Sequence, residues 1–401
     1  MSYSYRSSRG PSMARRQSHG GYTNKPRNNR RNMGEYIDPS RFIKAASATE
    51  NEAYVPQFTF EDFALEPLLK ANLASIGYVT PSPIQDQAIA PALSGQDIIG
   101  IASTGTGKTA AFALPVLQQL ITDPGSTALI IAPTRELAQQ IEEECKILAK
   151  NSGLSGVLLI GGTNMSKQLR QVKLLPRIVI GTPGRIKDHV QRGSLKLHRF
   201  NMIVLDEVDR MLDMGFINDV TEILSQTNVN RQSFFFSATM DAKVRRLIDN
   251  FTRDPLTISL KASATSENVH QNVVRYQNSS EKIDKLHDLL IKEGVAKAIV
   301  FDETQRGVER LNKELVGRGF LAESIHGGKS QGQRQRALAN FKQNHINILV
   351  ATDVAARGID VPDITHVVNF SVPKTYDDYI HRIGRAGRAG QVGYALTFVE
   401  H

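Results

Sequence analysis

Residues 102–109 read ASTGTGKT, a glycine-containing turn followed by a lysine and a threonine. An apolar run typical of a buried strand precedes the turn, and small helix-forming residues follow it. Such a turn binds phosphates through backbone N–H groups and the helix N-terminus, with the lysine on the β and γ phosphates and the threonine hydroxyl on Mg²⁺. The pattern predicts a nucleotide site made of Ser103, Thr104, Gly105, Thr106, Gly107, Lys108 and Thr109.

Two acidic residues, Asp206 and Glu207, end another apolar run. Paired surface acids are usually only solvated, but a pair at the tip of a buried parallel strand faces the sheet edge where ligands bind. Phosphate hydrolysis needs one carboxylate for the metal and another to orient and deprotonate water. The pair is therefore a candidate for the second half of the same site.

The elements that must position these groups are short apolar runs alternating with helical patterns, which predict parallel sheets with crossover helices. The pattern stops after about residue 255 and restarts near residue 269. We therefore predict an α/β fold with two tandem doubly wound parallel-sheet domains. The predicted strands lie in 97–102, 127–133, 156–162, 177–183, 201–207 and 233–239, and then in 297–303, 346–353, 365–371 and 394–400.

The domain organisation follows from these patterns. Residues 1–54 are predicted to be a disordered arginine-rich tail, because they lack a sustained apolar period. The first domain is predicted over 55–255, a linker over 256–268 and the second domain over 269–401.

Net charge is concentrated in the tail. The chain carries +9 over 401 residues, and residues 1–44 hold ten basic residues against two acidic ones. A flexible basic arm of this kind engages nucleic-acid phosphates, and its tyrosines can stack on bases. A purely solubilising extension is the alternative.

Other features indicate a soluble cytoplasmic protein. Apolar residues make up 40% of the chain, and no uninterrupted apolar run is long enough to span a membrane. The N-terminus lacks the apolar segment of a secretory signal. Cys145 is the single cysteine, so it has no disulfide partner within the chain, and its helical context favours packing over chemistry.

The ordered stretches GYVTPSPIQ, ASTGTGKT, PTRELA, GG, TPGR, DEVD, SAT, ATDVAARGID and HRIGRAGR closely resemble the DEAD-box RNA helicases of superfamily 2, with DEVD in place of DEAD. The stretches DEVDRMLDMGF and IHGGKSQGQR most resemble the RhlE-type bacterial branch. The resemblance covers the chain from about Phe60 onward. It implies two RecA-like domains, with ATP, Mg²⁺ and RNA bound in the cleft between them, and an ATP hydrolase that acts as an RNA helicase.

The resemblance also implies roles in the ATP site. Gln85 would contact the adenine edge, and Phe60 would stack on the base, although core packing is an alternative for Phe60. Asp206 and Thr109 would bind Mg²⁺, and Glu207 would be the general base. Asp209 would couple to Ser237 and Thr239, for which a plain polar strand end is the alternative. The family's usual alanine is replaced here by Val208.

In the second domain, Arg385 and Arg388 resemble arginine fingers that stabilise charge on the γ-phosphate, although a solvated basic face is the alternative. His381, Arg382 and Asp353 match positions used for interdomain coupling, and Asp360 matches a ribose contact. Ala386 stands where the family more often has threonine.

The implied RNA contacts are backbone amides, hydroxyls and arginines, which bind phosphates and 2′-hydroxyls without reading bases. Binding of structured or duplex RNA is therefore expected to be independent of sequence. The residues are Thr134, Arg135, Glu136, Gly161, Gly162, Thr182, Gly184, Arg185, His326, Gly327, Gln331, Arg334 and Thr352.

Two other functions stay open at this point: an ATP-gated RNA clamp that does not unwind, and a DNA translocase of the same superfamily. Strand displacement assays with and without ATP distinguish the clamp from a helicase. A comparison of RNA with DNA of equal sequence distinguishes the DNA translocase from an RNA helicase. Ribosomal and RNA-decay proteins are candidate partners, whereas a membrane is not.

Overall fold

The computed structural model describes residues 36–46, 54–103, 105–260, 268–292, 294–356, 361, 363–387 and 391–401. Three predicted site residues, Thr104, Asp360 and Arg388, lie outside the described residues. So do the tail up to residue 35, residues 47–53 and linker residues 261–267.

The first domain is built on a seven-stranded parallel sheet with strand order β3-β4-β2-β5-β6-β1-β7. Its central strands are short apolar runs with no exposed face, as expected for a parallel sheet that is covered on both sides. The strands are β1 (Ile98–Ile101), β2 (Ala128–Ile131), β3 (Gly156–Leu159), β4 (Ile178–Gly181), β5 (Met202–Leu205), β6 (Gln232–Ser237) and β7 (Leu256–Ser259).

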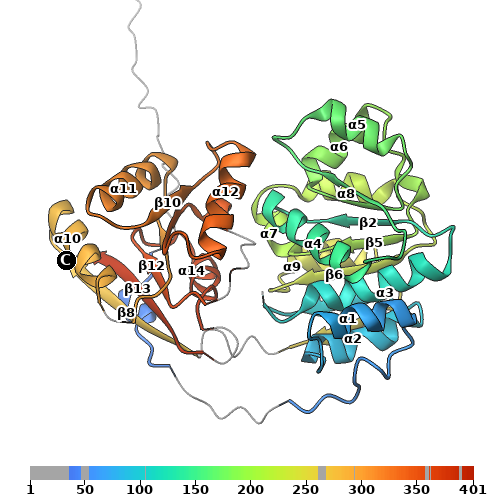
Figure 1. Cartoon of the computed structure of the whole chain (residues 1–401), viewed down its shortest axis with the longest axis horizontal. Coiled ribbons are helices and arrows are strands. Elements are labelled where there is room, and N and C mark those ends of the chain that lie inside the picture. The colour runs from blue at the N-terminus through green and yellow to red at the C-terminus, as the bar shows by residue number, and fades with distance from the viewer. Residues whose placement is uncertain are drawn as a thin grey trace, which may run out of the picture. The chain divides into compact units, whose positions relative to one another are not determined.

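Helices cover both faces of this sheet (Figure 1). One apolar cluster joins the sheet to α1 (Pro67–Ser75), α2 (Pro83–Leu93), α3 (Lys108–Thr122) and α4 (Arg135–Leu148). A second cluster on the other face joins it to α5 (Met165–Val172), α6 (Pro183–Gln191), α7 (Val208–Asp213), α8 (Ile217–Ser225) and α9 (Ala242–Asp249). A short 3₁₀ turn, η2 (Leu197–Arg199), precedes β5.

The second domain is built on a six-stranded parallel sheet with strand order β10-β11-β9-β12-β13-β8. Its strands are β8 (Val269–Tyr276), β9 (Ala298–Phe301), β10 (Ala322–Ile325), β11 (Ile348–Ala351), β12 (His366–Asn369) and β13 (Gly393–Glu400). Its helices are α10 (Ser279–Leu290), α11 (Gln305–Gly317), α12 (Gln331–Lys342), α13 (Asp353–Ala356) and α14 (Tyr376–Ile383). The two-domain α/β prediction is therefore confirmed.

Two boundaries of the predicted organisation were wrong. Residues 256–259, predicted as linker, form β7, which pairs with β1 at the edge of the first sheet. Residues 36–46, predicted as disordered tail, form a 3₁₀ turn, η1 (Pro39–Phe42), and a β-bridge from Lys44 to Gln271 of the second domain. Both corrections concern pairings over long sequence distances, which local composition does not reveal.

The parallel arrangement gathers the predicted site residues. Parallel strands present their carboxyl ends at one edge of the sheet, where ligands of such folds bind. In the first domain the turn 102–107 follows β1, Asp206 follows β5, and Ser237 ends β6. Since β6 pairs with both β1 and β5, these three strand ends are neighbours. Among the described residues, no helix has the length and apolar character needed to cross a membrane.

Candidate nucleotide and nucleic-acid site

In the turn between β1 and α3, the side chain of Lys108 folds back onto the backbone of the turn. The Nζ atom of Lys108 donates a hydrogen bond to the carbonyl oxygen of Ala102, at 2.8 Å, and only 6% of the residue is exposed. Gly107 begins the helix in the left-handed region, with a φ of 89°. A Cβ atom there would lie 2.5 Å from Nε2 of Gln85, so only glycine fits.

Gln85 connects helix α2 to this turn. Its Oε1 accepts a hydrogen bond from the backbone N–H of Ser82 at 2.9 Å, and its Nε2 donates to the carbonyl of Gly107 at 3.1 Å. The hydroxyl of Ser82 donates to the carbonyl of Thr106 at 2.7 Å. The amide expected to contact adenine is thus already fixed against the phosphate turn.

Phe60 lies in the core of the first domain. Its ring packs 5.6 Å from Tyr78 and 6.0 Å from Phe63, measured between ring centroids, and 4% of the residue is exposed. This is the packing role that the sequence left open. Stacking of Phe60 on a base stays a prediction.

The carboxylate cluster follows β5 directly. Glu207 adopts a left-handed conformation, with a φ of 53°, and its backbone N–H donates to Oδ1 of Asp206 at 2.9 Å. Asp206 and Glu207 are 2% and 3% exposed. Burial raises the pKa of Asp206 to about 6; the Lys108 ammonium opposes this shift, and the Glu207 carboxylate adds to it.

Asp209 joins the carboxylate cluster to the end of β6. Its Oδ2 accepts hydrogen bonds from the backbone N–H groups of Ala238 and Thr239, at 3.1 and 3.0 Å, and from the Thr239 hydroxyl at 3.2 Å. The Ser237 hydroxyl accepts a hydrogen bond from the backbone N–H of Asp209 at 3.3 Å. The expected contact exists in the structure, whereas its role in coupling stays a prediction.

One carboxylate oxygen of Glu207, Oε2, accepts no hydrogen bond within the described residues. This oxygen forms a long ion pair with Nε of Arg210 at 3.7 Å. A buried, incompletely solvated oxygen can bind and polarise a water molecule. Val208, which replaces the family's alanine, is completely buried in the apolar cluster below, so the larger side chain is accommodated by the core.

The predicted RNA residues of the first domain come together in one hollow, which Thr134, Arg135, Gly162, Thr182 and Arg185 help to line. Thr134 caps α4 by accepting a hydrogen bond from Leu137 N–H. The guanidinium of Arg135 lies against Gly161 and Gly162, where a Cβ would collide with it. Arg185 donates to the carbonyls of Ile160 and Thr163, at 3.0 and 2.7 Å, and so fixes the glycine turn. Glu136, also predicted, is buried at the start of α4, and Gly184 lies in the first turn of α6.

The two described arginines of the basic cluster in the second domain, Arg382 and Arg385, are buried, so a solvated basic face is the wrong interpretation for these two. Arg382 and Arg385 are each 3% exposed. Arg382 forms a two-pronged ion pair with Asp353, at 2.5 and 2.7 Å, and donates to the Ser371 carbonyl at 2.7 Å. His381 and Arg385 line the same small hollow as this pair. Arg382 and Asp353, expected to couple the domains, are thus paired inside the second domain.

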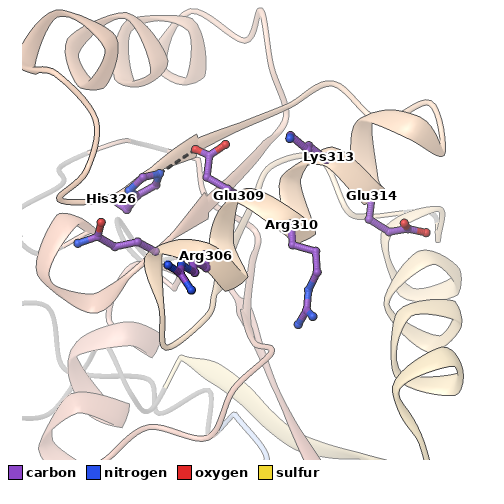
Figure 2. Close-up of a pocket in the computed structure, with 7 residues that line it drawn as sticks. Arg306, Glu309, Arg310, Lys313, Glu314 and His326 are labelled. Atoms are coloured by element: carbon purple, nitrogen blue, oxygen red, sulfur yellow. Dashed lines mark hydrogen bonds and ion pairs between the residues drawn. The ribbon is translucent and has the colours of Figure 1, made fainter.

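His326 and Glu309 form the centre of another hollow in the second domain, of about 600 Å³. Nε2 of His326 lies 2.7 Å from Oε1 of Glu309, and Figure 2 shows the two side chains pointing toward each other. Partial burial would raise the pKa of Glu309, but hydrogen bonds from His326, Ser324 and Lys329 outweigh it and lower the pKa to about 2. The carboxylate therefore stays ionised and holds the His326 ring in place.

The same hollow shows residues that the sequence analysis missed. Arg306, Arg310 and Lys313 follow one another along α11 and are exposed (Figure 2). Their spacing of four and three residues is the signal that could have identified a basic helix face. The remaining predicted RNA contacts of the second domain lie on three elements. Gly327 follows β10, Gln331 and Arg334 lie on α12, and Thr352 follows β11.

Comparison with known proteins agrees with this geometry. Residues 82–247 match the family model "DEAD/DEAH box helicase", and residues 281–390 match "Helicase conserved C-terminal domain". The chain is 43% identical over 342 residues to ATP-dependent RNA helicase CshA of Listeria monocytogenes, covering 85% of this chain and 66% of the relative. It is 43% identical over 343 residues to DEAD-box ATP-dependent RNA helicase CshA of Bacillus subtilis, covering 85% and 69%.

Two solved structures are similar over both domains. Dbp5 of S. cerevisiae bound to RNA and ADP BeF3 has a TM-score of 0.76 at 29% identity, covering 86% of this chain and 90% of that one. Mss116p bound to ssRNA and AMP-PNP has a TM-score of 0.75 at 32% identity, covering 84% and 73%.

The raised pKa of Asp206 predicts a stability effect. The folded protein holds this proton more tightly than the unfolded chain, so the contribution of Asp206 to the free energy of unfolding falls as pH rises from about 4 to about 6 and is level above that. Asp206→Asn should therefore be more stable than wild type by about 1–3 kcal/mol near pH 7.5, with a smaller gain near pH 4.5. Denaturant unfolding at both pH values measures this.

The exposed Asp249→Asn on α9 is the matched control for Asp206→Asn and should show no comparable gain. An equal gain for Asp206→Asn at both pH values would contradict a raised pKa at this site.

Proposed function

Because the chain belongs to the DEAD/DEAH box helicase family, we propose that it is an ATP-dependent RNA helicase of the RhlE-type branch. The observation that carries this function is the meeting of Lys108, Asp206 and Glu207 at one edge of the first sheet, with Gln85 hydrogen-bonded to the phosphate turn. The chain spans about two thirds of the length of the curated relatives given above, so the activity is proposed for the residues present.

The phosphate turn fits the β and γ phosphates of ATP. Lys108 is held at the turn by a single backbone carbonyl, a partner that a phosphate can replace with a charge-assisted hydrogen bond. Ser103, Gly105, Thr106 and Gly107 would offer backbone N–H groups. Gln85, which can both donate and accept, would contact the adenine edge.

Asp206 and Thr109 fit the Mg²⁺ that accompanies ATP. The Asp206 carboxyl is buried and holds its proton up to about pH 6, so a divalent cation beside it would restore the ionised form. Hard oxygen ligands from a carboxylate and a hydroxyl, completed by phosphate oxygens, are those that Mg²⁺ prefers. When bound, the ion would neutralise charge on the phosphates.

Glu207 would orient and deprotonate the attacking water. Glu207 follows Asp206 directly, with a left-handed backbone, and its Oε2, which accepts no hydrogen bond within the described residues, is the acceptor that this step needs. Asp209 would couple changes in the ATP site to the end of β6 through its hydrogen bond with the backbone N–H of Thr239.

The second domain would complete the site on closure. Arg385, with Arg388, would stabilise the charge that develops on the γ-phosphate, and Asp360 would contact the ribose. His381 and Arg382 would couple the domains, in exchange for the present pairing of Arg382 with Asp353. ATP and RNA together would close the cleft, bend one RNA strand and release its partner, and hydrolysis would reopen it.

RNA would be bound by its backbone, through the hollow that Thr134, Arg135 and Arg185 help to line and the loops that carry His326, Gly327 and Thr352 in the second domain. Backbone N–H groups, hydroxyls and arginines supply no base readout, so sequence preference should be weak. The 2′-hydroxyl contacts should favour RNA over DNA. Ribosomal or RNA-decay proteins are proposed partners.

Two substitutions separate ATP binding from hydrolysis. Lys108→Ala should weaken ATP binding by about 10- to 10²-fold, since a charged hydrogen bond is lost. Glu207→Gln should retain ATP and RNA but hydrolyse about 10²- to 10⁴-fold more slowly, because general-base catalysis is lost. ATPase and short-duplex unwinding assays, with the exposed Glu143→Gln as control, measure both. Wild-type turnover by Glu207→Gln would rule out its role as base.

Arg385→Ala tests the contribution of the second domain. RNA-stimulated turnover should fall by about 10³-fold, the lower range for an arginine finger, while the affinity for a fluorescent ATP analogue in the absence of RNA stays unchanged. Arg318→Ala, an exposed arginine on the far end of α11, is the matched control. Normal stimulated turnover by Arg385→Ala would refute closure as the activating step.

The basic tail predicts a salt effect. Residues 1–34 carry eight basic residues and no acidic one. If about four of them contact single-stranded phosphates, a chain that begins at Glu35 should bind RNA more weakly, with a slope of log affinity against log salt shallower by roughly 3. ATP binding should not change.

The salt titration needs a full-length control in which the eight basic residues are replaced by glutamine, because this separates charge from chain length. Parallel salt lines with equal affinity for the full and shortened chains would establish the solubilising alternative.

A further inference from the structure

Residues 36–46, which precede both family-model matches, are packed into the second domain rather than the first. Phe42 is completely buried and Ile37 is 5% exposed, in a cluster with Val269 of β8 and Ala395 of β13. Phe42 ends the 3₁₀ turn η1, which Asp38 caps by accepting a hydrogen bond from Ser40 N–H at 2.8 Å. The turn thus presents one large apolar side chain to the domain.

The main partner of Phe42 is helix α14. The ring of Phe42 lies 4.7 Å from that of Tyr379, centroid to centroid, and Ile383 completes the contact. The guanidinium of Arg41 lies 3.9 Å from the centroid of the Tyr376 ring, one turn earlier on the helix. Two consecutive residues of the segment, Arg41 and Phe42, therefore contact helix α14.

The segment also covers the edge of the sheet. β8 is an edge strand, and an uncovered edge exposes unpaired backbone groups. Lys44 exchanges both backbone hydrogen bonds with Gln271 of β8, at 3.0 and 2.8 Å. The backbone N–H of Ala46 donates to Nδ1 of His270 at 3.1 Å, and the side chain of Gln271 accepts from the Tyr379 hydroxyl at 2.9 Å. Segment, strand and helix are linked in one network.

Helix α14 is fixed from another direction by the ion pair of Arg382 with Asp353 and by the bond from Arg382 to Ser371. Backbone turns follow the helix directly, with Arg385 N–H bonded to the carbonyl of Arg382 at 3.1 Å. Arg385 lies two residues after Ile383, which contacts the segment. The position of the arginine thus depends on where α14 is held.

We propose that residues 36–46 are a fixed element of the second domain that positions α14 and, through it, Arg385. Phe42 is the central positioning residue, and the bridge at Lys44 sets the register of the segment on β8. The kinetic consequence rests on the proposed function of Arg385, whereas the docking itself does not.

Hydrogen exchange on the full-length protein tests the docking without reference to activity. The backbone amides of Lys44 and Gln271 should be protected in wild type. Phe42→Ala should raise exchange in residues 36–46 and 269–273 by at least about tenfold. Ile43→Ala is the matched control, because Ile43 is the next residue and is 56% exposed. Exchange of residues 36–46 at the rate of a free peptide in wild type would refute the docking.

RNA-stimulated ATPase tests the positioning role. Phe42→Ala should lower kcat by about 10- to 10²-fold, the cost of a misplaced catalytic group, with KM for ATP within about twofold of wild type. Phe42→Leu, which still fills the site, should recover most of this loss, and Ile43→Ala should behave as wild type. A wild-type kcat for Phe42→Ala with released exchange would refute the positioning role. Absence of stimulated turnover in wild type itself would instead refute the proposed function.

Discussion

Parallel pairing of β6 with both β1 and β5 is the constraint on which the site depends. It places three strand ends side by side, so that the turn before Lys108, a carboxylate pair and a hydroxyl-bearing strand end share one edge. Parallel strands require crossover helices, and these must cover both faces with apolar side chains. The two apolar clusters of the first domain satisfy that requirement.

Burial at this edge also sets the electrostatics of the carboxylates. Asp206 and Glu207 are removed from water without full compensation by cations, and the raised pKa of Asp206 is the direct result. The left-handed backbone at Glu207 adds local strain of the kind that functional sites retain. Mg²⁺ bound together with ATP would supply the missing positive charge, so the folded protein is prepared for its ligand at some cost to its own stability.

The second domain also buries charged side chains, Arg382 and Arg385. Arg382 is buried, and it is tolerated because Asp353, Asn369 and a backbone carbonyl satisfy its guanidinium. The same network fixes one side of α14, and the N-terminal segment packs on the helix through Phe42 and Tyr379. Residues 36–46 therefore precede the first domain in the sequence but pack as part of the second domain.

The fold class, the strand positions around the motifs and the family could all be predicted from the sequence, because apolar periodicity and motif spacing are local properties that a single stretch displays. Ten predicted strands coincide with strands of the two sheets. The sequence did not indicate β10, whose residues AESI lack a continuous apolar run, nor the helix face formed by Arg306, Arg310 and Lys313.

Four features could not be predicted from local sequence and follow from the folded chain: the placement of β7, the pairing of Arg382 with Asp353, the burial of Phe60 and the docking of residues 36–46. The docking of residues 36–46 depends on partners far apart in the chain: Ala46 and His270 are separated by 224 positions. A polar, arginine-rich neighbourhood predicts disorder from composition, yet the segment is held by buried apolar side chains and by a paired strand edge. Such contacts form only when the whole domain has brought their partners together.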